Sequence, residues 1–185
     1  MKMQRADAAR NTEQLLAAAA RLFAERDPAE VTMEEIAQAA GVGKATLYRR
    51  FPDRASIAAA LLGEHETELQ EAMLRGEPPL GPGAPPGERL AAFYGAMVEL
   101  LERHGRLVLG TEVGHERFSV GAYGFWRAHV LALLREADCR DPQAMVDLLL
   151  APVAPEVYLY QRRRLRVASA RIRTNLEELA RRMLG

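Results

Sequence analysis

The residues of this chain that could do chemistry together lie in one short stretch, residues 41–51, GVGKATLYRRF. Two glycines stand beside a lysine, a threonine, a tyrosine and two arginines, and a phenylalanine ends the stretch. These residue types fit a phosphate-binding loop, a charged surface without a ligand, or a helix that lies against nucleic acid. A phosphate-binding loop needs the order glycine, lysine, hydroxyl directly after a strand. Here Thr46 comes two residues after Lys44, and a predicted helix precedes both, so we exclude that loop.

The residues before this stretch predict a helix that would position it. TMEEIAQAAG places Thr32 and Glu35 in the register of a capping box, which marks the start of a helix. Gly41 ends that helix, because glycine adopts the left-handed conformation that a sharp turn requires. The sequence therefore predicts a helix, a short turn and a second helix of about eight residues that begins at Lys44.

The second helix has an outward face that suits a groove of duplex DNA. Leu47 and Phe51 are four residues apart and are expected to face inward together with Ile36. The remaining residues form outward pairs at the same spacing: Lys44/Tyr48, Ala45/Arg49 and Thr46/Arg50. Cations can meet phosphates and guanine edges, and the threonine, tyrosine and alanine can meet phosphates or thymine methyl groups. The alternative is an amphipathic helix whose charged face is only solvated, and most helical faces of this composition are of that kind.

The order of the whole block resembles the N-terminal DNA-binding domain of TetR-type (TetR/AcrR-like) transcriptional regulators. The shared frame is apolar-Ala-Ala-x-x-apolar-Phe in a first helix, Thr-x-x-x-Ile-Ala in a second, Ala-Gly-Val at the turn and Thr-Leu-Tyr-x-x-Phe in the last. The resemblance covers about residues 10–62 and implies a three-helix helix-turn-helix domain that binds double-stranded operator DNA. It implies these DNA-binding residues: Thr32, Gly43, Lys44, Ala45, Thr46, Tyr48, Arg49, Arg50 and Arg54.

Two positions depart from the family pattern. Asp27 stands where glycine is common, and we expect the turn to survive because aspartate tolerates the left-handed conformation. Gly43 stands where serine or threonine is common, which predicts a weaker cap for the helix that reads DNA.

Helical periodicity extends over the rest of the chain, so the predicted fold class is all-α, with no strand pattern. We predict two domains: the helix-turn-helix domain at residues 1–62 and a helical effector-binding and dimerisation domain at residues 63–185. A Pro/Gly-rich loop is expected at residues 76–87, because proline removes hydrogen-bond donors. The predicted helices outside the helix-turn-helix motif cover about 11–26, 54–75, 88–103, 106–113, 118–137, a stretch from 141 that Pro152 and Pro155 interrupt, and 165–184.

The C-terminal part resembles the family in layout but not in motif. An apolar seam on the last helix and the apolar run MVDLLLAPV fit dimerisation, and equally fit packing inside one subunit. The resemblance favours a homodimer, which would read a near-palindromic operator. The expected interface residues are Leu148, Leu149, Leu165, Ile172, Leu176, Leu179 and Met183.

Aromatic residues gather in two of the C-terminal helices. Such side chains with few polar groups suit a pocket for an apolar small-molecule effector, as the resemblance implies, although ordinary core is the commoner reading for each one. The candidate lining residues are Phe93, Tyr94, Met97, Phe118, Tyr123, Phe125, Trp126 and His129.

Charge is unevenly distributed along a chain whose formal net charge is zero. Residues 64–160 carry fifteen Asp/Glu against eight Lys/Arg, and residues 161–185 carry two against eight. The basic C-terminal arginines are expected to be solvated or to pair with this acidic middle. One cysteine, no signal-peptide core and no apolar run long enough for a bilayer predict a soluble cytoplasmic protein without membrane contact.

No catalytic signature is present, so we expect neither an enzyme nor a cofactor. Glu112 and His115 are three residues apart, a spacing that is common by chance, and no metal site is expected. The leading hypothesis is a ligand-responsive transcriptional repressor that an effector releases from its operator. The alternative is a helical small-molecule-binding or assembly module whose DNA-binding head is vestigial.

Overall fold

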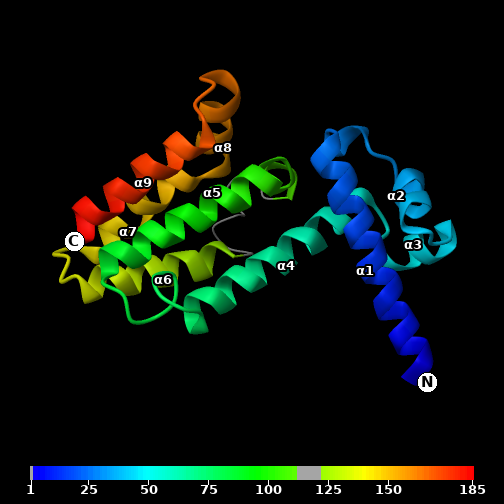
Figure 1. The fold of residues 1–185 in the computed structure, drawn as a ribbon, viewed down its shortest axis with the longest axis horizontal. Helices are drawn as coiled ribbons and strands as arrows, with labels where there is room; N and C mark the ends of the chain where they lie inside the picture. Colours follow the sequence, from blue (N-terminus) through cyan, green and yellow to red (C-terminus); the bar gives the residue numbers. More distant parts are fainter. Residues whose placement is uncertain (1, 112–121) are drawn as a thin grey trace. The chain divides into compact units, whose positions relative to one another are not determined.

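The structure, a computed structural model, describes residues 2–111 and 122–185, and most of these residues lie in helices (Figure 1). It divides into two compact units, Met1–Glu64 and His65–Gly185. Every regular element in the described residues is a helix, which confirms the all-α prediction. None of the helices in this part is both long enough and apolar enough to cross a membrane.

The first unit consists of α1 (Lys2–Glu25), the 3₁₀ turn η1 (Pro28–Glu30), α2 (Met33–Ala40), α3 (Lys44–Arg50) and the first turns of α4 (Arg54–Arg75). The expected left-handed turn at Asp27 is wrong, since the only described non-glycine residues with positive φ are Asp138 and Arg166. The chain turns instead through η1, where the Glu30 N–H donates to the Asp27 carbonyl at 2.9 Å.

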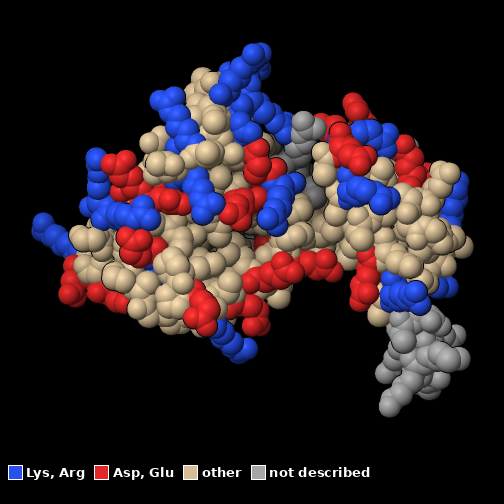
Figure 2. Space-filling model, in the orientation of Figure 1, with Lys and Arg blue, Asp and Glu red and all other residues tan. Residues whose placement is uncertain are grey.

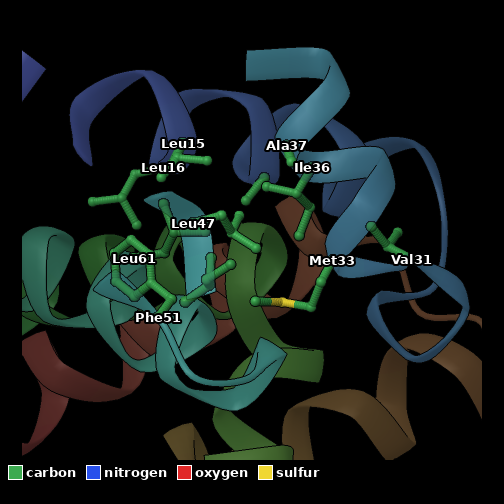
Figure 3. Close-up of a cluster of buried hydrophobic side chains, with 11 residues drawn as sticks. Leu15, Leu16, Val31, Met33, Ile36, Ala37, Leu47, Phe51 and Leu61 are labelled. Atoms are coloured by element: carbon green, nitrogen blue, oxygen red, sulfur yellow. The ribbon is translucent and has the colours of Figure 1, made fainter. Parts of the chain in front are cut away.

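One hydrophobic cluster holds the helices of the first unit together (Figure 3). Leu15 of α1, Ile36 of α2 and Leu47 of α3 have no solvent-exposed surface. Phe51 and Leu61, from the chain that follows α3, complete the cluster. Burying each such side chain contributes roughly 1.5–3 kcal/mol, so the short helix α3 is held by packing and not by its own helix propensity.

A capping box starts α2, as the sequence predicted. The Thr32 hydroxyl accepts the Glu35 N–H at 3.2 Å, and the Thr32 N–H donates to the Glu35 carboxylate at 2.8 Å. Arg26, the residue directly after α1, forms an ion pair with the same carboxylate at 2.8 Å. The Thr32 N–H, the Arg26 guanidinium and the Thr32 hydroxyl together lower the pKa of Glu35 from its usual 4.5 to about 2.

We expect Glu35→Gln to destabilise the protein at pH 7 by more than at pH 2. The folded-state pKa of Glu35 lies below its unfolded value, so its stabilising contribution is complete above about pH 4.5 and is lost as the pH falls toward 2. Urea unfolding followed by circular dichroism measures the difference between variant and wild type at each pH. A difference that stays constant between pH 7 and pH 2 would contradict this assignment.

The second unit contains the remainder of α4, followed by α5 (Pro86–Thr111), α6 (Tyr123–Glu136), α7 (Pro142–Leu150), the 3₁₀ turn η3 (Ala151–Val153), α8 (Pro155–Leu159), the π-helical turn η4 (Tyr160–Arg164) and α9 (Ser169–Leu184). Helices were expected at 88–103 and at 106–113, but the chain forms one helix, α5, as far as Thr111, where the first range of described residues stops. Gly105 does not break it, because Leu159 packs over the glycine: a Cβ there would lie 3.2 Å from Leu159 Cδ2.

Helix α9 packs along α5 and begins at Ser169, four residues later than expected. The preceding residues are instead a π-helical turn, after which Arg166 has a positive φ of 54°. Arg173 pairs with Glu99 at 2.8 Å, and Arg181 pairs with Glu88 at 2.9 Å. The expected pairing between the basic C-terminal region and the acidic middle is therefore confirmed, and positive and negative side chains are mixed over this unit (Figure 2).

Candidate nucleic-acid interface

The turn between α2 and α3 fixes the direction of α3. Gly41 has φ 66° and ψ 24°, the left-handed conformation that glycine adopts without strain. The Val42 N–H donates to the Ala37 carbonyl at 3.0 Å and closes the end of α2. Gly43 caps α3 without a side-chain hydrogen bond. The two helices and their turn therefore form a helix-turn-helix motif.

The buried and exposed faces of α3 follow the predicted pattern. Leu47 is fully buried, whereas the side chains of four expected DNA-binding residues are exposed: Lys44, Ala45, Arg49 and Arg50. Tyr48 is also exposed, with 44% of its surface accessible. Thr46 is half-buried. One helical face thus presents cations, a phenol and a methyl group to the outside.

Glu34 of α2 contacts two of these exposed groups. Its carboxylate lies 3.5 Å from the Lys44 ammonium and accepts a hydrogen bond from the Tyr48 hydroxyl at 3.4 Å. A backbone N–H and Lys44 lower the pKa of Glu34, so it is ionised at neutral pH. Partial desolvation and the Glu34 carboxylate raise the pKa of Tyr48, so the phenol keeps its proton. The carboxylate therefore holds Lys44 and Tyr48 side by side and offsets one positive charge.

The two arginines of α3 are the least engaged cations of this face. Within the described chain, neither Arg49 nor Arg50 forms an ion pair or a side-chain hydrogen bond. The Arg50 guanidinium lies 5.9 Å from the centre of the Phe51 ring, a cation–π distance that orients it without neutralising its charge. Both charges are available to an anionic ligand.

The side chains of Thr32 and Arg54 form hydrogen bonds within the described part of the protein, unlike those of Arg49 and Arg50 of α3. Both the N–H and the hydroxyl of Thr32 donate to the Glu35 carboxylate, at 2.8 and 2.9 Å. Arg54 is half-buried, and its Nη1 donates to the Val31 carbonyl at 3.1 Å. These contacts fix the start of α2 against α4, which positions the α2–α3 pair.

A cavity of about 500 Å³ lies within the second unit. Three of the expected effector-pocket residues line it: Met97, Tyr123 and Trp126. The other described candidates are Phe93, Tyr94, Phe125 and His129, which are not among its lining residues, and Phe118 lies outside the described residues. Tyr94 is fully buried, and its hydroxyl donates to the Leu149 carbonyl at 2.7 Å.

Sequence patterns did not indicate several residues that matter at these two places. Arg127 and Asp147 line the cavity although they are twenty residues apart, because α6 packs against α7. Glu34 reaches α3 only because the turn at Gly41 folds one helix over the other. Nothing in the local spacing of these residues distinguishes them from ordinary surface charges.

The expected dimer-interface residues fall into two groups. Leu149, Ile172 and Leu176 are buried inside the chain, the last two where α9 meets α5. Four others remain exposed within one subunit: Leu148, Leu165, Leu179 and Met183.

The described residues contain no group of three or more His, Cys, Asp or Glu side chains that could hold a metal ion. The candidate pair Glu112 and His115 lies outside them.

Comparison with protein families matches residues 15–61 to the family described as "Bacterial regulatory proteins, tetR family". An uncharacterised HTH-type transcriptional regulator of Mycobacterium tuberculosis is 46% identical over 65 residues, 33% of this chain and 32% of that protein. The HTH-type transcriptional repressor BepR of Brucella suis is 35% identical over 75 residues, 40% of this chain and 36% of BepR. The matches thus span about a third of the length of these relatives.

Similarity in fold extends over nearly the whole chain. The crystal structure of the transcriptional regulator FadR of Bacillus subtilis in complex with stearoyl-CoA superimposes with a TM-score of 0.66, covering 91% of this chain and 96% of FadR. Its sequence identity is 18%, so this likeness concerns the fold alone.

Proposed function

The N-terminal domain of this chain is that of a TetR-type regulator, as its motifs indicated, and we propose that the protein is a DNA-binding transcriptional repressor. In this proposal residues 1–62 form the DNA-binding domain and residues 63–185 the effector-binding and dimerisation domain. The observation that carries it is the outward face of α3, where Arg49 and Arg50 have no counter-ion in the described chain.

The charge distribution supports an interface confined to α3 and its flanks. Residues 44–54 carry Lys44, Arg49, Arg50 and Arg54 against Asp53, in a protein whose net charge is zero. Long-range attraction by the whole protein is therefore weak, and binding must come from local contacts with phosphates and base edges. Of the nine proposed DNA-binding residues, Thr32 and Arg54 orient α2 and α3, and the residues of α3 make the contacts.

Fluorescence anisotropy of a labelled mixed-sequence duplex at increasing salt concentrations tests this function. We expect the logarithm of the association constant to fall linearly with the logarithm of the salt concentration, by about 0.9 per phosphate contact. The alternative, a small-molecule-binding or assembly module with a vestigial DNA-binding head, predicts no measurable binding even at low salt.

Dimerisation would place two copies of α3 in successive major grooves of a near-palindromic operator. The exposed apolar residues Leu179 and Met183 of α9 and Leu148 of α7 support this arrangement, since one subunit leaves them in solvent. An effector bound in the second domain would change the separation of the two α3 helices and so release the repressor. Such a regulator acts in the cytoplasm, where the DNA is, and needs neither a cofactor nor a catalytic centre.

We expect Leu179→Glu to convert the dimer to a monomer, because two buried carboxylates without partners would face each other in a symmetric interface. Sedimentation velocity measures the change. Leu74→Glu is the matched control, since Leu74 is an exposed leucine of α4, with 56% of its surface accessible. A wild-type protein that sediments as a monomer at micromolar concentration would contradict the proposed dimer.

Glu34→Gln is expected to strengthen binding to any duplex by roughly two- to fivefold, the range typical of one exposed charge pair. The substitution removes a negative charge beside the phosphates and frees Lys44 from its ion pair. Anisotropy measures the gain. Glu25→Gln, which removes the same charge from the end of α1, should change affinity much less. Weaker binding by the Glu34 variant would mean that the carboxylate is needed to position Lys44 and Tyr48.

A further inference from the structure

The walls of the cavity in the second unit are mostly apolar. Six large apolar side chains from α5, α6, α7 and η3 contribute to the lining: Met97, Leu100, Leu101, Trp126, Leu150 and Val153. Its volume of about 500 Å³ lies within the range of ligand pockets, roughly 300–1,000 Å³. A cavity of this size and lining favours an apolar molecule over water.

The polar side of the cavity is a network in which opposite charges are already paired. Asp147 accepts from Arg127 Nε at 3.1 Å and from the Tyr123 hydroxyl at 2.8 Å. Arg127 Nη2 makes further contacts at 3.3 Å with Asp147 and with Gln143. Arg127 and Tyr123 lower the pKa of Asp147, so the carboxylate is ionised at neutral pH. Glu66, the other acidic lining residue, is also engaged by another group.

This pairing disfavours a charged ligand of either sign. An anion would meet two carboxylates and one guanidinium whose Nε and Nη2 already donate to Asp147 and Gln143. A cation would have to compete with Arg127 for Asp147. Either ion would also lose part of its hydration against the apolar walls, which disfavours it relative to a neutral group of the same size. A neutral hydroxyl group needs only one additional hydrogen bond, which it can donate to the Tyr123 oxygen, because the hydrogen of Tyr123 already goes to Asp147.

We propose that this cavity binds an uncharged, largely apolar molecule whose single hydroxyl group hydrogen-bonds at the Tyr123–Asp147–Arg127 network. The apolar body lies against Met97 and Trp126. The proposal rests on the proposed function only in taking this molecule to be the effector. Binding itself can be measured without DNA.

Trp126 provides a direct readout, because it is the only tryptophan of the chain and it lines the cavity. The probes are three frameworks, a linear ten-carbon chain, a monoterpene and naphthalene, each carrying an alcohol, a carboxylate or an ammonium group. Tryptophan emission and calorimetry are recorded for each probe. We expect the alcohol of at least one framework to bind at least about tenfold more tightly than both of its charged counterparts, a difference of about 1.4 kcal/mol. Tighter binding by a charged member, or no binding by any probe, would overturn the proposal.

Asp147→Asn tests whether the probes bind at this cavity and whether the Asp147–Arg127 ion pair disfavours charged ligands. Without the Asp147 charge, Arg127 loses its counter-ion, so the carboxylate probe should gain at least about fivefold in affinity while the alcohol changes less. Asp138→Asn is the matched control, because Asp138 is an exposed aspartate outside the cavity and asparagine tolerates its positive φ of 51°. An unchanged preference in the Asp147 variant would also overturn the proposal.

The same probes are then added to the protein bound to duplex DNA. Alcohol binding together with release of DNA supports both the ligand class and the repressor mechanism. Alcohol binding without any effect on DNA binding supports the ligand class and contradicts the effector-release part of the proposed function. DNA binding by a protein that binds none of the probes contradicts the ligand class alone.

Discussion

The double substitution Arg49→Ala, Arg50→Ala is expected to weaken binding to a cognate duplex by at least roughly thirtyfold. Each arginine contact to a base or phosphate is worth about 1–3 kcal/mol, and these two cations of α3 have no competing partner in the described part of the protein. The slope of the logarithm of the association constant against the logarithm of the salt concentration should become less steep by roughly one unit for each phosphate contact removed. Anisotropy titrations of wild type and variant on one duplex, over a range of salt concentrations, give both quantities.

Arg163→Ala, Arg164→Ala is the control for this experiment. These two arginines are also adjacent and exposed, but they belong to η4 of the second unit, so the variant has the same net charge without any change in α3. We expect its affinity and salt slope to stay close to those of the wild type. Equal losses in both variants would mean that binding follows overall charge, and the assignment of α3 as the reading helix would be wrong.

Leu47→Ala is expected to lower the free energy of unfolding by about 2–5 kcal/mol and to abolish specific DNA binding. Leu47 is the only fully buried side chain of α3 and packs between Ile36 and Phe51 (Figure 3). A helix of seven residues is not stable by itself, so the loss of this contact should release α3 from the domain. Urea unfolding measures the stability, and anisotropy measures the binding.

Leu74→Ala tests whether burial causes the effect. It removes the same atoms from an exposed leucine of α4, and surface substitutions of this kind usually change stability by less than about 0.5 kcal/mol. If Leu47→Ala unfolds at the same urea concentration as wild type, packing does not hold α3. If it is destabilised but still binds a specific duplex with wild-type affinity, the position of α3 does not depend on Leu47.

The helix-turn-helix motif could be predicted from the sequence because its determinants are local. The Thr32–Glu35 capping box, the left-handed Gly41 and the inward spacing of Leu47 and Phe51 each act within a few residues. The interruption of the helix after Leu150 was predictable for the same reason, since a proline inside a helix removes a backbone N–H and kinks or breaks the helix.

The features that the sequence did not predict depend on contacts between distant residues. The low helix propensity of Gly105 predicted a helix end, yet Leu159 packs over this glycine and α5 continues. The carboxylate of Glu34 and the pair Arg127–Asp147 gain their positions only when helices cross. The apolar spacing of α9 predicted a packed face, but spacing alone could not separate packing against α5 from packing against a second subunit. Ile172 and Leu176 are buried against α5, whereas Leu179 and Met183 remain exposed.

Selection of bound sequences from a pool of random duplexes tests the central claim most directly. The claim is that the outward side chains of α3 read base edges in a major groove, once from each subunit of a symmetric dimer. We predict that repeated selection recovers an inverted repeat whose half-sites are separated by about one helical turn or a multiple of it. Recovery of no common sequence, from a protein shown to be folded, would contradict the claim.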